Sequence, residues 1–534
     1  MQYPIRLAAS VVAAMALAAC ASLPPERGYA ETSAAVEARL GIAPTYRPGP
    51  AAAGSTAEAD VPTKPLSVDD AIRIAFIHNP RMQEVYARIG LSRAELEDAR
   101  RVSNPTLGYA KLDPRTGPGA QITRSLSLGF SELLLLPARK RFATAELARI
   151  QNVVAAELLV LATDVETAWY TSVGATLVAQ MRDAVATSAQ ASAELAQRFF
   201  DAGNINRLQL EQERAASVRA RIDAVRADAE ADRARSQLAN LLGVPSHGAW
   251  STLQQLPSPP VIEMDTEALV DLARSQRLDL VAARQSVTQR EDALGVTRRW
   301  RWLGSIDIGY EREEEVDGSE IRGPTLALAL PIFNQGQGAL ARARAELLSA
   351  RSELDALTLS VQNGTRLALD QLRLSHDIAE RYRTALLPSR EAIVARSQEQ
   401  TNFMLMGVFE LIRAKQDEYD AYQEYLEAVR DYWIARAELK QQIGGELPDD
   451  ASDRPGTIGV EAILPAAEMP PMDHSMHGMK PAESSDPHAG HQMPTTAPED
   501  PHAGHKMAPS DETEEDAAEA DPDTHSTHEH GDTP

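Results

Sequence analysis

Apolar residues recur with a helical period along much of the chain. In the second quarter they occupy positions 147, 150, 154, 158, 161, 165, 169 and 173, a mean spacing of about 3.7 residues. Residues 138–244 contain no proline, and residues 332–447 contain only Pro388. The pattern predicts a helix from Pro137 to near Gly203, about 100 Å long at ~1.5 Å per residue. A helix of that length must pack along other long helices, because it cannot bury itself in a globule.

The helical pattern gives way to a period of two at four short places. These runs are Leu107–Lys111, Leu126–Ser131, Ile306–Tyr310 and Leu326–Leu330, and a polar loop containing glycine separates the members of each pair. They predict two β-hairpins. Aromatic residues lie at their margins, as in the girdles of membrane barrels: Tyr109, Phe130, Trp300, Trp302, Tyr310 and Phe333. The alternative is a pair of soluble hairpins that cap a helical bundle.

The chain also repeats itself at an offset close to 200 residues. AFIHNPRM from Ala75 matches ARSQRLDL from Ala273, LGYAKL matches IGYERE, and LANLLG matches LKQQIG, at offsets of 198 to 201. A nearly constant offset indicates a duplicated unit. We therefore expect two repeats, residues 66–250 and 260–447, each with one hairpin between long helices. Ser67, followed three residues later by Asp70, predicts the N-cap of the first helix.

Four strands cannot close a barrel, since small membrane barrels need about eight or more. An open sheet edge in lipid would leave backbone groups unpaired at a cost of several kcal/mol each. If these strands cross a membrane, copies of the chain must complete the barrel together.

The N-terminus has the features of a secretory signal. Residues 7–19 are almost wholly apolar and follow Arg6, which is typical of a cleaved leader. The end of this stretch, LAAC, resembles the lipobox of bacterial lipoproteins, which implies removal of residues 1–19 and lipidation of Cys20, the only cysteine. The alternative is an ordinary cleavage site with an incidental cysteine. Residues 20–65 are rich in Pro, Ala and Gly and predict an extended linker.

Together these features resemble the TolC-type outer-membrane efflux channels over residues 66–447. The resemblance rests on the duplicated helix–hairpin–helix order, on the AFIHNPRM opening and on the glycine turns FFDAGNINRLQL and FMLMGVFELIRA. It implies a mainly α fold with a small β part, in which coiled-coil hairpins form an α-barrel tunnel. It also implies a homotrimer whose strands form one twelve-stranded transmembrane β-barrel.

The same resemblance assigns roles to individual residues. Gly203 and Gly407 would lie at periplasmic tips that meet an adaptor protein and an inner-membrane pump; the alternative for each is a simple turn or helix-cap glycine. Glu410 lies where the family places an acidic aperture residue. The second acid expected one turn later is Arg413 here, which puts a double acidic ring in doubt. The alternative for Glu410 is a solvated surface charge.

The net charge is −24, which argues against nucleic-acid binding. The sequence holds no evident nucleophile triad, phosphate loop or metalloprotease motif. We therefore expect a protein that is not an enzyme, conducts passively and requires no cofactor.

Residues 448–534 lose the helical period and gain prolines, which predicts a disordered acidic tail. This tail holds nine of the twelve histidines, and DPHAGH occurs twice in it. Imidazole with thioether sulfur favours soft ions, above all Cu(I). The candidate ligands for copper ions are Met472, His474, Met476, His477, Met479, His488, His491, Met493, His502, His505, Met507, His525, His528 and His530. The alternative is a solubilising tail with chance histidines.

These observations predict an outer-membrane lipoprotein, anchored at Cys20, that conducts copper, silver or other heavy-metal cations out of the periplasm. A drug or protein export channel of the same fold is one alternative. A periplasmic coiled-coil lipoprotein that sequesters metal without a pore is another.

Overall fold

The computed structural model describes residues 28–45, 64–261, 264–448 and 456–460. The chain divides into two compact units, residues 1–467 and 468–534. The second unit lies outside the described residues.

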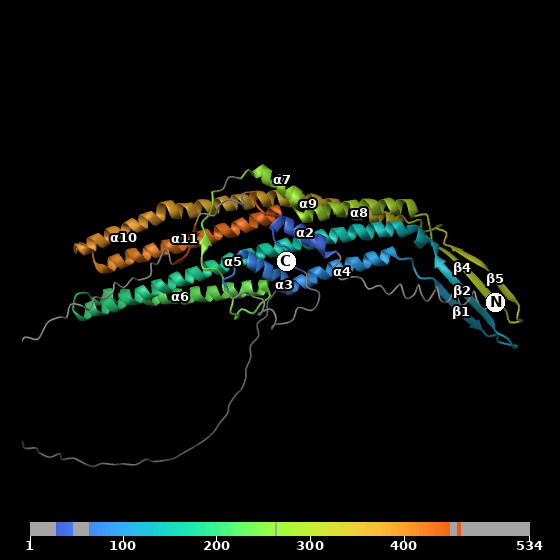
Figure 1. Ribbon diagram of the computed structural model, residues 1–534, viewed down its shortest axis with the longest axis horizontal. Coiled ribbons are helices and arrows are strands. Elements are labelled where there is room, and N and C mark those ends of the chain that lie inside the picture. Colours follow the sequence, from blue (N-terminus) through green and yellow to red (C-terminus); the bar gives the residue numbers. More distant parts are fainter. Residues whose placement is uncertain (1–27, 46–63, 262–263, 449–455, 461–534) are drawn as a thin grey trace, which may run out of the picture. The chain divides into compact units, whose positions relative to one another are not determined.

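The first unit contains two successive sets of elements in the same order (Figure 1). The first set is α3 (Val68–His78), α4 (Pro80–Arg100), β1 (Thr106–Leu112), β2 (Gln121–Gly129), α5 (Phe130–Asp201) and α6 (Arg207–Leu242). The second is α7 (Thr266–Gln276), α8 (Leu278–Trp300), β4 (Ile306–Glu314), β5 (Glu320–Leu328), α9 (Gln337–Arg381), η1 (Tyr382–Leu386), α10 (Leu387–Asn402) and α11 (Val408–Ile443). The final helix of each set, α6 and α11, is 36 residues long.

The predicted long helix is present but begins earlier than expected. α5 is 72 residues long and starts at Phe130, directly after β2, so that Pro137 lies inside it. Proline inside a helix usually costs about 3 kcal/mol because it removes a hydrogen bond and crowds the preceding turn. The prediction that Pro137 begins the helix was wrong, because the strand leads into the helix without a loop.

The long helix of the second set is interrupted. A π-helical segment, η1, separates α9 from α10, and Pro388 follows it. The backbone N–H of Leu387 donates to the carbonyl of Tyr382, five residues earlier. A π-segment holds one more residue than an α-turn, so the two long helical arms are not identical in register.

The four predicted strands form one antiparallel sheet in the order β1-β2-β4-β5. The two hairpins therefore pair with each other through β2 and β4. Strands β1 and β5 are the edges, and each has one neighbour within the described part of the chain. The sheet lies at one end of the helices, and the turns α5–α6 and α10–α11 lie at the other (Figure 1).

Aromatic residues fasten the two repeats together in the middle of the helices. Tyr170 of α5 stacks on Trp433 of α11 with ring centroids 5.5 Å apart. The indole N–H of Trp169 donates to the carbonyl of Leu66 at 3.0 Å, and that of Trp433 donates to the carbonyl of Pro257 at 2.7 Å. Each buried indole thus pairs its polar atom with a connecting segment, which holds that segment against the helices.

The helix-start prediction at Ser67 is confirmed, since its hydroxyl accepts from the Asp70 N–H within a capping box. Two other expectations were wrong in part. The proposed extended linker contains helix α2 (Tyr29–Leu40), which packs on α5 through the buried residues Thr32 and Val36. Within the segment expected to be disordered, β6 (Thr457–Ile458) pairs with β3 (Leu256–Pro257).

Candidate functional site

The sheet has two chemically different faces. Its residues can be assigned to them because residues directly opposite one another in an antiparallel sheet lie on the same face. One face, called here the carboxylate face, carries Asp307, Glu311 and Glu313 of β4. Its other residues are small, polar or aliphatic and include no base: Thr106, Gly108, Ala110, Leu112, Gln121, Thr123, Ser125, Ser127, Gly129, Gly309, Ile321, Gly323, Thr325 and Ala327. The Gln121 side-chain amide donates to Glu313 across the strands.

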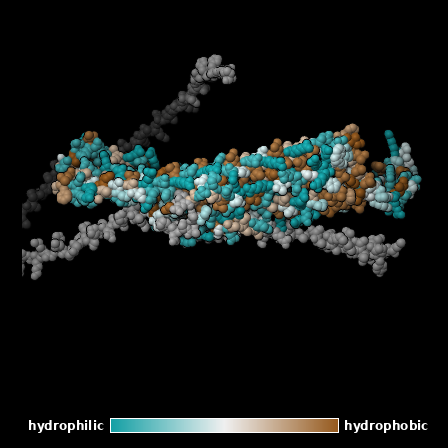
Figure 2. Space-filling model, turned by 90° about the horizontal axis from the view of Figure 1, so that it is seen from above, coloured by the Kyte–Doolittle hydropathy of each residue, from teal (hydrophilic) through white to brown (hydrophobic). Residues whose placement is uncertain are grey.

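The opposite face, called here the apolar face, carries large hydrophobic side chains next to the helices. These hydrophobic members are Leu107, Tyr109, Leu126, Leu128, Ile306, Ile308, Tyr310, Pro324, Leu326 and Leu328. The end of this face toward the hairpin loops carries Lys111, Ile122, Arg124, Arg312, Glu314, Glu320 and Arg322. Many of the hydrophobic members are exposed in the single chain, with Leu107 at 77% and Leu326 at 71%. The aromatic residues Phe130, Trp300, Trp302 and Phe333 are also exposed at its helix-proximal margin. Figure 2 shows hydrophobic residues gathered near the sheet end, with hydrophilic residues beyond them.

The two turns at the far end of the helices have the same hydrogen-bonding pattern but different residues. Gly203 has φ +76° and donates to Phe200; Met404 has φ +56° and donates to Thr401. Met404, and not Gly407, is therefore the structural equivalent of Gly203. Gly407 instead N-caps α11 with φ −73°.

The tips also differ in exposed chemistry. Phe403, Met404 and Leu405 are 76%, 93% and 78% exposed. Gly203 and Asn204 occupy the corresponding place in the first turn and are exposed as well. Met404 is the one residue other than glycine with positive φ among those described, and this conformation costs an ordinary residue about 1–2 kcal/mol.

Glu410 and Arg413 both lie in the first turns of α11 and are exposed. In the described part of the chain no ion pair joins them, so the pairing at i, i+3 that their spacing allows is not formed. Both lie just after the tip, and the aperture role stays a prediction. An aperture role would need the facing residues of other chains.

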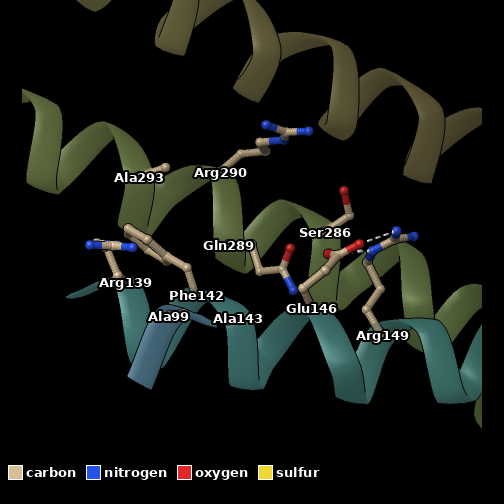
Figure 3. Close-up of a pocket in the computed structure, with 10 residues that line it drawn as sticks. All are labelled: Ala99, Arg139, Phe142, Ala143, Glu146, Arg149, Ser286, Gln289, Arg290 and Ala293. Carbon is tan, nitrogen blue, oxygen red and sulfur yellow. Dashed lines mark hydrogen bonds and ion pairs between the residues drawn. The ribbon is translucent and has the colours of Figure 1, made fainter. Parts of the chain in front are cut away.

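A groove of about 640 Å³ runs between α5 and α8 near the sheet. It is lined by Arg139, Glu146 and Arg149 of α5 and by Gln289 and Arg290 of α8 (Figure 3). Arg149 donates to both oxygens of Glu146, at 2.6 and 2.9 Å. The hydrogen bonds from Arg149 lower the pKa of Glu146 despite its partial burial. Arg139 and Arg290 also form ion pairs, with Glu132 and Glu346, so each of these groove charges has a partner of opposite sign.

Comparison with known proteins gives a consistent result. No family model matches the sequence. The chain is 27% identical over 340 residues to the cobalt-zinc-cadmium resistance protein CzcC of Cupriavidus metallidurans, covering 61% of this chain and 78% of CzcC. Its structure matches CusC, described as a transmembrane channel, with a TM-score of 0.59 and 16% identity over 71% of this chain and 92% of CusC. It also matches the outer membrane protein VceC of Vibrio cholerae, with a TM-score of 0.59 and 15% identity over 71% and 96% of the two chains.

The chain therefore has the fold of the TolC-type outer-membrane channels that it matches. The resemblance inferred from the sequence and the predicted fold class are thereby confirmed, including the long helices and the small sheet. Within the described residues, no helix has the length and apolarity to cross a bilayer.

Several residues assigned from the sequence lie outside the described part of the chain. They are Cys20 and all fourteen proposed metal ligands between Met472 and His530. Among the residues that are described, no group of three His, Cys, Asp or Glu side chains is placed to hold a metal ion. Lipidation and metal binding therefore stay predictions.

The sequence analysis missed the carboxylate face. Asp307, Glu311 and Glu313 alternate with apolar residues in the predicted strand, so the period of two contains the signal. What it lacked was the pairing of β4 with β2, which shows that these acids share a face with small residues and no base.

Proposed function

We propose that this protein is the outer-membrane channel of a tripartite efflux pump and conducts metal cations passively out of the periplasm. The observation that carries the proposal is the carboxylate face of the sheet. The channel fold and the name of the relative CzcC, a cobalt-zinc-cadmium resistance protein, support it.

The two faces of the sheet determine which side meets water. In a closed barrel the apolar face must turn toward lipid, where exposed leucines and tyrosines are favourable. The carboxylate face then lines the lumen and contributes Asp307, Glu311 and Glu313 from every chain. Rings of Asp and Glu side chains favour cations in membrane channels.

The edge strands β1 and β5 support assembly as a homotrimer, since each has one neighbour among the described residues. Strand β1 of one chain would pair with β5 of the next, so that three four-stranded sheets close without unpaired backbone. Exposed apolar residues on the helices supply further surface for packing between chains: Leu348, Leu359, Leu367 and Leu374 of α9, and Val218, Ile222 and Val225 of α6.

The helix tips are the proposed docking points for a periplasmic adaptor and, through it, an inner-membrane pump. Gly203 and Gly407 both lie in these turns. The exposed Phe403, Met404 and Leu405 give the second turn an apolar surface that a partner could bury.

The proposed cargo follows from the tail and from the relative. Histidine with methionine favours copper or silver, whereas the name of CzcC speaks of cobalt, zinc and cadmium. We propose that the tail binds periplasmic metal, with copper or silver first, while the mature chain is anchored in the outer membrane through lipid on Cys20.

Ion selectivity in planar bilayers tests the conduction proposal. The double variant E311Q/E313Q should lower the potassium-to-chloride permeability ratio, because it removes two lumen charges from each chain. E314Q is the matched control: it removes a carboxylate from the same strand, but one that lies on the other face. Equal ratios in all three proteins, or an anion-selective wild type, would contradict the proposal. Absence of any conductance would favour the alternative of a scaffold without a pore.

Deleting residues 469–534 tests the tail separately. We expect reduced tolerance of copper or silver, with channel conductance unchanged. If tolerance of every metal is unchanged and only drug tolerance depends on the full protein, the metal assignment fails and a drug channel of the same fold is favoured.

A further inference from the structure

The apolar face of the sheet ends in a row of arginines. Arg124 of β2 lies directly opposite Arg312 of β4, and Arg312 lies directly opposite Arg322 of β5. Tyr109 of β1 completes the row opposite Arg124. All three arginines are exposed and lie on the side of the apolar residues that faces the hairpin loops.

These like charges are only partly compensated by the chain itself. Arg312 forms a two-pronged ion pair with Glu320 of the next row, at 2.6 and 2.8 Å. Within the described residues no ion pair reaches Arg124 or Arg322. Glu314, also in the next row, lies opposite Glu320 and pairs with none of these arginines. Like charges directly opposite one another destabilise a sheet. Bound anions would relieve this repulsion among the three arginines.

The row and the helix-proximal aromatics lie at opposite ends of the apolar rows of the sheet. Ile306, the first residue of β4, and Arg312 are six residues apart, which at ~3.4 Å per residue and a tilt of ~40° cover about 16 Å, and the turn that carries Trp302 precedes Ile306. The apolar band of a membrane barrel is ~25 Å tall. With Trp302 at the inner boundary, the arginines lie at the outer boundary, and the hairpin loops lie beyond it.

We propose that Arg124, Arg312 and Arg322 bind the phosphates of a phosphorylated glycolipid in the outer leaflet. The inference rests on the membrane placement in the proposed function. The lipid's acyl chains would lie against Leu126, Leu326 and their neighbours, and its phosphates against the arginines. Guanidinium groups bind phosphate oxygens in pairs of parallel hydrogen bonds, and adjacent strands present three such groups side by side.

The test measures lipid binding to the full chain, purified in detergent, by native mass spectrometry. The probe is an acylated glucosamine disaccharide with two phosphates, and the comparison is the same glycolipid after both phosphates are removed. R124Q/R322Q should bind the phosphorylated lipid about tenfold more weakly than the wild type, since charged hydrogen bonds to phosphate are lost. It should bind the dephosphorylated lipid as the wild type does.

The matched control is R342Q/R344Q, which removes two exposed arginines that belong to α9 and not to the sheet. It should bind the phosphorylated lipid like the wild type. Equal binding by R124Q/R322Q, or no preference of the wild type for the phosphorylated lipid, would overturn the proposal. If inorganic phosphate at equal concentration displaces the lipid, the row is a site for free anions and the proposal also fails.

Conductance of the same preparations in planar bilayers separates the two proposals. If the wild type conducts normally but binds the two glycolipids equally, only the glycolipid site is refuted. If the wild type does not conduct at all, the proposed channel on which the site depends is refuted.

Discussion

Three glycines with the same backbone conformation but different surroundings give a quantitative test of the fold. Gly203, Gly243 and Gly444 have φ +76°, +72° and +79°. A Cβ on Gly203 would meet nothing within 4 Å, whereas one on Gly243 would lie 2.3 Å from the carbonyl oxygen of His78. Gly444 is intermediate, with Arg277 Cα at 3.1 Å. Gly243 and Gly444 end the last helices of the two repeats, and each packs on a junction between two helices.

The expected costs follow from these distances. Alanine in the left-handed region costs about 1–2 kcal/mol at each position. At Gly243 the overlap is with backbone, which cannot rotate away, and forced overpacking adds about 1–3 kcal/mol. G203A should therefore destabilise its turn by about 1 kcal/mol, G243A by about 3 kcal/mol or more, and G444A by an intermediate amount.

Hydrogen–deuterium exchange measures these costs locally, without reversible unfolding of the whole channel. Local opening around residue 203 should become about fivefold more frequent in G203A, and around residue 243 about 150-fold more frequent in G243A. If G243A opens no more often than G203A, the close contact between the end of α6 and the α3–α4 junction is wrong.

The remaining predictions concern three other contacts. Arg149 lowers the pKa of Glu146, so the stabilisation is present above the pKa of a free glutamate and is lost as pH falls through the folded-state pKa. E146Q should therefore lower the melting temperature at pH about 7, and its effect should shrink as the pH is lowered. An effect that does not change with pH would exclude the ion pair as the cause. Arg235 donates to the carbonyl of Trp250 at 2.6 Å, and its guanidinium lies 4.0 Å from the centre of the Trp250 ring. R235K should therefore destabilise the loop around Trp250 by about 2 kcal/mol, measured as faster hydrogen–deuterium exchange there. Unchanged exchange would show that the guanidinium is dispensable. M404G should slow local opening of its turn about threefold, because relief of backbone strain exceeds the added chain entropy, and faster opening would show that the Met404 side chain contributes packing.

The strands could be predicted from the sequence because alternation with a period of two is a local signal. The same holds for the helix start at Ser67, whose partner Asp70 is three residues away. Helix α2 could not be predicted, since its few buried side chains, such as Val36, gain their stability from packing on a distant helix. Tertiary contact here outweighs a weak local preference.

The backbone detail of the tips could not be predicted either. Glycine favours the left-handed conformation, but the second turn places Met404 in it, while Gly407 lies at the N-cap of α11. The row of arginines also depends on a pairing between β2 and β4, whose residues are far apart in sequence. Strand register across such a separation is not written in either strand alone.

The difference between the two turns has a consequence for any protein that caps the helical end. In a trimer of this duplicated chain, six tips would surround the helical end, and turns that carry Gly203 would alternate with apolar turns that carry Met404. A ring of six identical subunits would therefore meet two different surfaces in alternation. Its binding energy would repeat with threefold symmetry, even where the outline of the tips looks sixfold.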